Sequence, residues 1–425
     1  MHSFNDLQQL DKEQAADYLL TAVNTASLTL KHPQLHIETY CRQNRRYRKA
    51  NVLLFSDAQQ RNHWYLIQIY NLADGYICND DVVNPLNAGE ITELEKKIPN
   101  NELGFNLNSQ NTHISGFLFS QVRPYHYMYD QLVTYFQLSE KQCINQFSFT
   151  DKHCFYRQLP NGHALKQSDE NDCYLFPCTK GGIYDDKYAE EMHSFIRTNS
   201  SLIPSKSDLT IWLGITAQKR SWLEQVEGQC NLVRELDKHY PSITVIIDGW
   251  TSLADGIPDS PKDISRDMAV FDTLSTRLKK LKNIEIINLI GKDYKEKISY
   301  ARSIDCFIAN SGTGGMIPMM FTQKSGVLHS NGKLHTFERS YTQRVQNVPH
   351  EKIHAQDLSL DSGVYSIDWK VIYNLLADVL GLDQRLKENR VIKNKHYLNL
   401  KKFIFKKSIQ IGVAMKKLSQ KLHNI

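Results

Sequence analysis

The stretch FIANSGTGGMIPMM, Phe307–Met320, passes from apolar residues through Ser, Thr and three glycines and back to apolar residues. With the preceding residues IDC it predicts a short buried strand, 304–310, a glycine-rich loop and then a helix. Pro318 fits such a helix only near its start, because a proline deep inside would break it. The stretch therefore predicts a strand–loop–helix unit of an α/β fold.

The residues around this unit repeat the same alternation. Longer polar segments with helical spacing separate short runs rich in β-branched or aromatic residues, at 208–214, 242–248, 283–290, 304–310 and 325–330. Strands separated by helices of this length imply βαβ crossovers and a mostly parallel sheet. We expect a Rossmann-like, doubly wound domain over residues 205–382, which ends with an amphipathic helix at 366–382.

The first two hundred residues are less regular. Closely spaced strand-like runs at 51–57, 63–72 and 75–79 indicate antiparallel hairpins, and the run at 113–120 precedes a helix at 130–138. Pro and Ser near 201–208 indicate a linker. We therefore predict an acceptor-side α/β domain at 1–200, a nucleotide-sugar-binding domain at 205–382 and a basic C-terminal tail at 383–425.

Composition favours a reduced, globular chain. The 425 residues are 41% hydrophobic, and eight cysteines are scattered without a repeated CxxC pair. No positive-then-apolar leader follows MHSFNDLQQL, so a cytosolic location is expected. Cys173 and Cys178, with His153 and Cys154 upstream, fit no common zinc spacing, so buried thiols are favoured. No apolar run reaches the roughly 18 residues of a membrane-spanning helix.

The tail carries most of the positive charge. From Arg385 onward there are twelve Lys/Arg and one acid, against 39 basic and 45 acidic residues before it. Apolar residues recur at helical spacing in the tail, at Leu400, Ile404, Ile411, Met415, Leu418 and Leu422. This pattern predicts a cationic amphipathic helix on an anionic membrane surface, or a terminal helix that packs on the body. Nucleic acid is disfavoured, because the tail has few aromatic residues and the body is acidic.

Several strand ends carry residues suited to a nucleotide. Ligands of such sheets bind at the carboxyl ends of the strands, where glycines expose backbone N–H groups to phosphate. Lys219 and Arg220 would neutralise a diphosphate there. The expected donor-binding residues are Lys219, Arg220, Asp248, Gly291, Ser311, Gly312, Thr313 and Gly314. The alternative is a glycine-rich turn that only permits tight packing.

Other nucleotide sites fit less well. No GxGxxG follows the first strand of the predicted sheet, and no acid lies about 20 residues later, which disfavours NAD and FAD. No GxxxxGK[ST] motif is present, which argues against a P-loop NTPase. Asp80 and Asp81 are adjacent turn residues and form no convincing metal site. We therefore expect neither a cofactor nor a bound metal.

The segment GFLFSQVRPYHYMYDQL, which contains His126 and Asp130, holds the best candidate base. We expect a loop with Arg123 and the aromatic residues to follow the strand, and a helix to begin near Asp130. Histidine is the natural general base near neutral pH, and a carboxylate four residues on could orient it. The alternative is a helix-capping Asp and a structural His among packed tyrosines.

These motifs together resemble a glycosyltransferase family. ITAQKRSWLEQVEGQCNLV, YKEKISYARSIDCFIANSGTGGMIPMMF and RPYHYMYDQL are similar to motifs of family 61 glycosyltransferases, which include capsular polysaccharide enzymes of the GT-B fold. The similarity covers residues 115–138 and 208–335. The family has His in a loop of the form HGAG, where this chain has Ser311. The N-terminal domain is also not an obvious Rossmann half, which leaves the acceptor side open.

The resemblance implies a GT-B-like enzyme that moves a sugar from a nucleotide donor to a capsule or lipopolysaccharide-type acceptor. His126 would be the base, with Asp130 behind it, and inversion is the expected outcome. We expect the enzyme on the inner face of the cytoplasmic membrane. The alternatives are a sugar-nucleotide epimerase or hydrolase of the same fold, and a non-catalytic membrane-associated scaffold.

Overall fold

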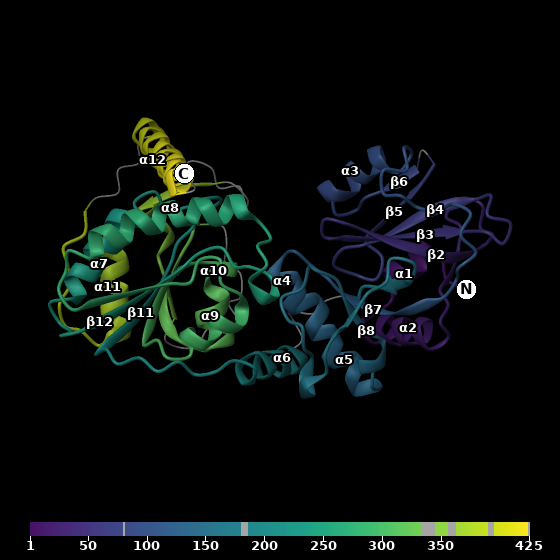
Figure 1. Cartoon of the computed structure of the whole chain (residues 1–425), viewed down its shortest axis with the longest axis horizontal. Coiled ribbons are helices and arrows are strands. Elements are labelled where there is room, and N and C mark those ends of the chain that lie inside the picture. The colour runs from purple at the N-terminus through teal and green to yellow at the C-terminus, as the bar shows by residue number, and fades with distance from the viewer. Residues whose placement is uncertain (80, 180–185, 333–344, 356–362, 390–394, 424–425) are drawn as a thin grey trace. The chain divides into compact units, whose positions relative to one another are not determined.

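The chain folds into two compact units, Met1–Phe195 and Ile196–Ile425, in a computed structural model (Figure 1). The structure describes residues 1–79, 81–179, 186–332, 345–355, 363–389 and 395–423. The division falls a few residues before the linker predicted at 201–208. The fold is mixed α/β, as predicted, with two parallel sheets, a six-stranded antiparallel sheet and a two-stranded antiparallel hairpin in the described part of the chain.

The second unit is built on a six-stranded, fully parallel sheet of order β13-β12-β11-β14-β15-β16. This is the 3-2-1-4-5-6 order of the Rossmann fold. All five strands predicted for this region are confirmed, and β16 was not predicted. The bounds are β11 Leu209–Gly214, β12 Ile243–Asp248, β13 Ile284–Asn288, β14 Cys306–Asn310, β15 Ser325–His329 and β16 Val345–Asn347.

Helices cover both faces of this sheet (Figure 1). α7 (Gln225–Leu236) packs against α8 (Pro261–Leu278) and α11 (Trp369–Leu380) on one face. On the other, α9 (Tyr294–Ala301) packs against a π-helical segment, Met316–Phe321, that continues α10 (Thr313–Gly315). A small hairpin of β17 (Ile353–Ala355) and β18 (Tyr365–Ile367) precedes α11. The strands β11, β12, β14 and β15 are almost entirely buried, which is why they read as apolar runs.

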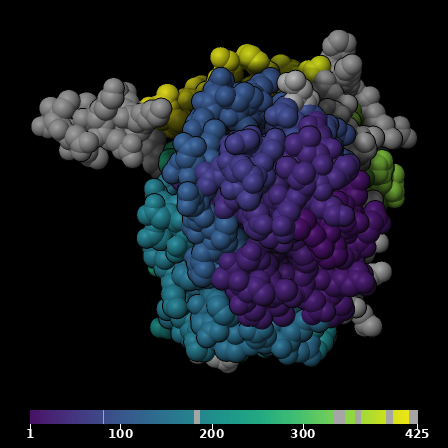
Figure 2. Space-filling view, turned by 90° about the vertical axis from the view of Figure 1, so that its right-hand side faces the viewer, coloured from purple at the N-terminus to yellow at the C-terminus, as the bar shows by residue number. Residues whose placement is uncertain are grey.

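The first unit begins with a six-stranded antiparallel sheet in chain order, β1 to β6. The hairpins predicted from residues 51–79 are confirmed as β3, β4 and β5, whereas β1, β2 and β6 were not predicted. The bounds are β1 Thr29–Lys31, β2 Glu38–Tyr47, β3 Ala50–Ser56, β4 His63–Gln68, β5 Gly75–Cys78 and β6 Asp81–Val83. Residues of this part of the chain, coloured purple to blue, cover much of the face shown in Figure 2.

A second sheet of the first unit is parallel, in the order β10-β7-β8-β9. Its strands are short: β7 Ile114–Phe119, β8 Ser148–Thr150, β9 Lys166–Gln167 and β10 Cys173–Leu175. Further α-helices of the N-terminal part lie outside the His126 segment: α1 Phe4–Gln9, α2 Lys12–Asn24, α3 Gly89–Lys97 and α6 Asp186–Thr198.

The segment after β7 differs from the prediction. Instead of a loop up to Asp130, α4 begins at Pro124 and runs to His126, a π-helical segment continues it at Tyr127–Leu132, and α5 spans Val133–Lys141. The expected start near Asp130 was wrong because Pro124 occupies the first helical position, where its fixed φ favours a helix and its missing N–H costs nothing. His126 and Asp130 therefore lie on one continuous helical segment.

The tail forms a helix, α12, Lys395–His423, which packs along α8. The predicted helix is thus present, and its packing on the body agrees with one of the two alternatives. The side chains of Leu418 and Leu422 lie outside the described part of the chain. None of the described helices is long and apolar enough to span a bilayer.

Gly326 of β15 gives a test of the central sheet. A Cβ at this position would lie 2.3 Å from the carbonyl oxygen of Phe307, its partner residue on β14. Because a paired backbone cannot move away, Gly326→Ala should lower the free energy of unfolding by about 3 kcal/mol in urea titrations. Gly314→Ala is the control, since its Cβ would lie an ordinary 3.5 Å from Asn310. Equal stability of the two variants would contradict this packing.

Candidate functional site

The carboxyl edge of the parallel sheet brings together most of the predicted donor-binding residues. In the 3-2-1-4-5-6 order the strand order reverses at β11, so that the connections after β11 and after β14 run to opposite sides, and ligands of such sheets bind in the crevice at this switch point. Lys219 and Arg220 lie in the segment after β11. Ser311 and the glycines come directly after β14. The predicted basic pair and the predicted glycine loop therefore leave adjacent strands at the same edge.

The two loops are in contact. The side-chain amide of Asn310, the last residue of β14, donates a 2.7 Å hydrogen bond to the carbonyl oxygen of Arg220. Gly312 has φ +95°, a conformation that favours glycine, and a Cβ there would lie 3.7 Å from Nη1 of Arg220. Ser311 is buried, whereas Thr313 and Lys219 are exposed. The guanidinium of Arg220 thus lies beside the glycine loop.

A short hydrogen-bond relay continues from Asn310 into the sheet. Asn310 Nδ2 also donates to the hydroxyl of Tyr365, at 2.8 Å, and that hydroxyl lies 2.6 Å from Nδ1 of His329. Because Arg220 offers a carbonyl oxygen, the amide group of Asn310 must face it, so Tyr365 accepts from Asn310 and donates its own proton to His329. Nδ1 of His329 is therefore the acceptor, and its proton is on Nε2.

The imidazole of His329 is neutral, and its Nε2–H group has no hydrogen-bond acceptor among the described residues. Burial lowers the pKa of His329 to about 3. Burial also raises the pKa of Tyr365, which keeps the hydroxyl proton that the relay requires. Among the described residues no atom pairs with Nε2 of His329. A buried N–H donor without a partner costs free energy, so it marks a position where a ligand or water oxygen would be stabilised.

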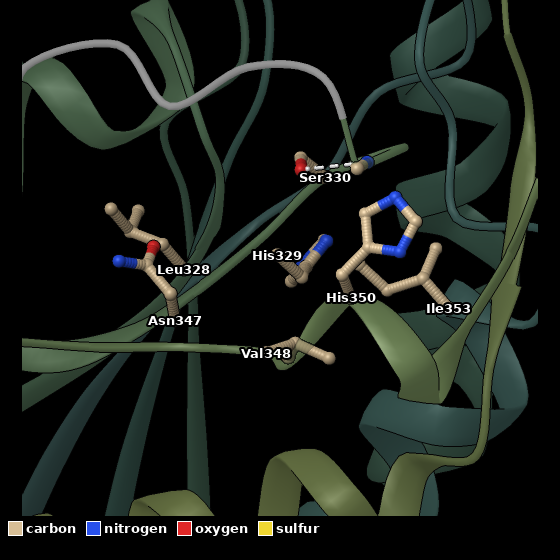
Figure 3. Close-up of a pocket in the computed structure, with 8 residues that line it drawn as sticks. Leu328, His329, Ser330, Asn347, Val348, His350 and Ile353 are labelled. Carbon is tan, nitrogen blue, oxygen red and sulfur yellow. Dashed lines mark hydrogen bonds between the residues drawn. The ribbon is translucent and has the colours of Figure 1, made fainter. Parts of the chain in front are cut away.

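A small cavity of about 20 Å³ lies beside this donor, with room for about one water-sized group. Figure 3 shows the side chains of His329, Ser330 and His350 around this space, with the hydroxyl of Ser330 accepting from the backbone N–H of Gly332 at 3.0 Å. The backbone N–H of Ser311 donates to the carbonyl oxygen of His329 at 2.8 Å, which joins the glycine loop to the same strand end.

Asp248 and Gly291 lie at the same edge but have structural partners. The Asp248 carboxylate is buried and forms a 2.6 Å ion pair with Nζ of Lys297, which also donates to Gly249, Trp250 and Thr251. Gly291, with φ +77°, donates its N–H to the carbonyl oxygen of Trp250 at 2.8 Å. Their predicted contacts with donor base and ribose stay a prediction.

Asp267 of α8 ties two of the loops together. Its two carboxylate oxygens accept from the backbone N–H groups of Ala217, at 2.9 Å, and Trp250, at 2.8 Å. Burial raises the pKa of Asp267 to about 7. Asp267 and Lys297 lie inside helices with no motif around them, so neither carries a signal in the sequence. His329 lies at the carboxyl end of a predicted strand, where ligands of such sheets bind. This position could have marked His329 as a candidate in the sequence, but it was not included.

In the first unit, His126 and Asp130 form the predicted pair. Nδ1 of His126 lies 2.7 Å from Oδ2 of Asp130, and the side chains are 26% and 15% exposed. Burial raises the pKa of Asp130, against the opposing effect of His126. With Nδ1–H donating to the carboxylate, Nε2 is the basic nitrogen. The arrangement is that of an imidazole oriented by a carboxylate for proton transfer.

Tyrosine rings flank His126. The ring of Tyr70 lies 4.2 Å from the imidazole centroid and that of Tyr125 lies 5.2 Å away, edge to face. The backbone at Tyr70 is fixed by Asp74, whose buried carboxylate accepts from three consecutive N–H groups at 2.6–2.9 Å. These contacts hold His126 in one orientation while part of its surface stays accessible.

The cysteines and acids form no cluster of three metal-ligating side chains among the described residues. Cys173 faces Cys41, with 3.3 Å between the sulfur atoms, and Cys178 is buried.

In comparisons with known proteins, no protein-family model matches the chain, and no curated protein matches it.

His329 provides a pH test of the relay. Because its pKa is 6.5 when unfolded and about 3 when folded, the folded state binds fewer protons, and stability is lost as the pH falls below 6.5. Between pH 7 and pH 5 the wild type should lose about 2 kcal/mol more unfolding free energy than His329→Asn, whose side-chain oxygen can accept from Tyr365. Urea titrations at both pH values measure the difference, and parallel losses would show that His329 titrates normally.

Proposed function

We propose that the chain is a glycosyltransferase that moves a sugar from a nucleotide donor to a surface-glycan acceptor. The main support is the position of Arg220, with the exposed Lys219 next to it in the chain, beside the glycine loop at the switch point of a 3-2-1-4-5-6 sheet. A nucleotide diphosphate leaving group carries concentrated negative charge, which this combination of cations and small residues accommodates.

The second unit would bind the donor. The Arg220 guanidinium can pair with two phosphate oxygens, and the exposed Lys219 next to it would add a second cation. Gly312 and Gly314 leave room for phosphate close to the backbone, and Thr313 offers a hydroxyl donor. Ser311 stands where the resembled family has His, and its backbone N–H donates to the carbonyl oxygen of His329 on the adjacent strand.

The first unit would supply the base. Transfer to an acceptor hydroxyl requires removal of its proton, and the Nε2 lone pair of His126 suits this step while Asp130 stabilises the resulting imidazolium. The proton moves from the acceptor oxygen to Nε2, the acceptor oxygen forms the new bond to the sugar, and the nucleotide diphosphate leaves with the electron pair of the old bond. The flanking tyrosine rings are suited to pack against a sugar face.

The resemblance to family 61 glycosyltransferases supports the same assignment, because the similar motifs fall at the basic strand exit, the glycine loop and the His126 helix. The proposal includes the GT-B fold class and a capsule or lipopolysaccharide-type product. It does not require a metal ion, since cations of the chain can neutralise the diphosphate.

Nucleotide binding is the first prediction of this function. In a panel of UDP, GDP, CMP and their sugar conjugates, one nucleotide at about 100 times its dissociation constant should add about 2.7 kcal/mol to the unfolding free energy, read as a rise in melting temperature. In Lys219→Asn/Arg220→Asn this rise should largely disappear, because both cations are lost. Asn is chosen because Arg220 has φ +52°, which Asn tolerates well.

The matched control is Lys279→Asn/Lys280→Asn. It removes the same charge from the same unit, but at the end of α8, next to the amino edge of the sheet. This variant should keep the full rise. If folded wild-type protein responds to no nucleotide, the glycines of the loop serve packing and the scaffold alternative replaces the transferase.

His126 can be tested by turnover. His126→Ala should lower the rate of nucleotide diphosphate release from the donor that the panel identifies, with a lipid-linked saccharide as acceptor, by about 10²–10⁴-fold. The dissociation constant of the donor should not change, because the donor residues lie in the other unit. His113→Ala, an exposed position of the same unit, should have no effect. Unchanged turnover in His126→Ala would assign His126 a structural role.

A further inference from the structure

α12 has two apolar faces on opposite sides of the helix. Successive residues of an α-helix are rotated by 100° about its axis. On this basis the mean direction of the apolar residues that pack on the body differs by about 150° from the mean direction of a second, exposed set of apolar residues. The packed set consists of Leu398, Phe405, Ile409, Gly412 and Val413, and the exposed set consists of Leu400, Phe403, Ile404, Ile411 and Met415. We call the second set the exposed stripe.

The packed face fixes the orientation of the helix. Leu398 and Ile409 are buried against the core of the second unit. Gly412 lets α12 approach α8 closely, since a Cβ there would lie 2.9 Å from Cβ of Ala269. Lys401 adds an ion pair with Glu224. Because one face is held in this way, the exposed stripe points away from α8.

The exposed stripe is large for a surface without a partner. Its five side chains are 57–67% exposed and span an arc of about 120° over four helical turns. Five large apolar side chains exposed on one side of a helix are uncommon on soluble proteins and indicate a site of interaction. The sequence predicted four of these residues as one face, whereas Phe403 was not included.

The positive charge of α12 indicates what kind of partner the exposed stripe would bind. α12 contains eight lysines and no acidic residue. Lys406 and Lys407 are both exposed: Lys406 lies outside the arc of the stripe, whereas Lys407 lies within it, with its Nζ 5.8 Å from the ring centre of Phe403. Exposed apolar side chains with lysines among and beside them match an anionic lipid surface, where the apolar groups enter the acyl boundary and the lysines face phosphate headgroups.

We propose that α12 binds an anionic membrane surface through the exposed stripe while its opposite face stays packed on α8. The helix lies in the plane of the bilayer and acts as a peripheral anchor for the second unit. This assignment does not depend on the glycosyltransferase function, since it rests on the exposure and charge of α12 alone. The inner leaflet of a cytoplasmic membrane, which carries anionic lipid, fits this surface.

Vesicle flotation tests the proposal with the full-length protein. Wild type should float with vesicles of phosphatidylcholine and phosphatidylglycerol, and much less with phosphatidylcholine alone. Ile404→Glu/Ile411→Glu should lower the partition coefficient at least about tenfold, because two stripe positions become charged. Asn399→Glu/Gln410→Glu adds the same charge at exposed positions outside the stripe and should retain most of the binding. Salt at about 0.5 M should weaken binding through screening of the lysines.

Three results would overturn the proposal: no flotation of folded wild type with anionic vesicles, equal loss in both double variants, or a dimer in light scattering that Ile404→Glu/Ile411→Glu converts to a monomer while flotation is unaffected. The first would remove the membrane as the partner. The second would reduce the effect to net charge. The third would assign the stripe to a second copy of the chain. Melting temperatures of the variants check that α12 stays packed.

Discussion

The side-chain amide of Asn310 is the interaction on which the carboxyl edge of the parallel sheet depends. Its two N–H groups bond to the carbonyl oxygen of Arg220 and to the hydroxyl of Tyr365. One residue at the end of β14 thereby positions the basic loop after β11 and sets the tautomer of His329 on β15. An aspartate at this position could not replace it, since a carboxylate would face the carbonyl oxygen with no proton to donate.

Buried charge holds the neighbouring loops in a comparable way. Lys297 is fully buried, a situation that is costly unless the charge is paired and its remaining protons are bonded. Asp248 and three oxygens of residues 249–251 meet that requirement, and Asp267 links the loops after β11 and β12. Removing any one partner would leave another buried polar group unsatisfied, so the edge behaves as a coupled network. A rigid edge of this kind is what a phosphate site requires, because donors must be in place before the ligand arrives.

The parallel sheet could be predicted from the sequence because each buried strand is an apolar run bounded by polar helices. The placement of Lys219, Arg220 and the glycine loop at the carboxyl edge of the sheet could be predicted from the strand ends, and their contact with a donor stays a prediction. Tyr365, Asp267 and Lys297 could not be found in this way, since each contributes through a contact with residues distant in sequence. The early antiparallel sheet was recognised only at β3, β4 and β5, which are apolar and largely buried, and not at β2, although only two residues separate β2 from β3. β2 was missed because Arg42, Arg45 and Arg46 interrupt its apolar alternation.

The helix at His126 was misplaced for a related reason. Aromatic residues and a proline were interpreted as a loop, although Pro124 is well suited to a first helical position. A π-helical segment continues this helix, and another, at Met316–Phe321, comes after the glycine loop. In the second, Pro318 has no N–H to donate, and the wider turn accommodates its ring without ending the helix. π-turns are rare in regular helices and common at functional positions. Both predicted site segments therefore carry a backbone feature that is common at functional positions.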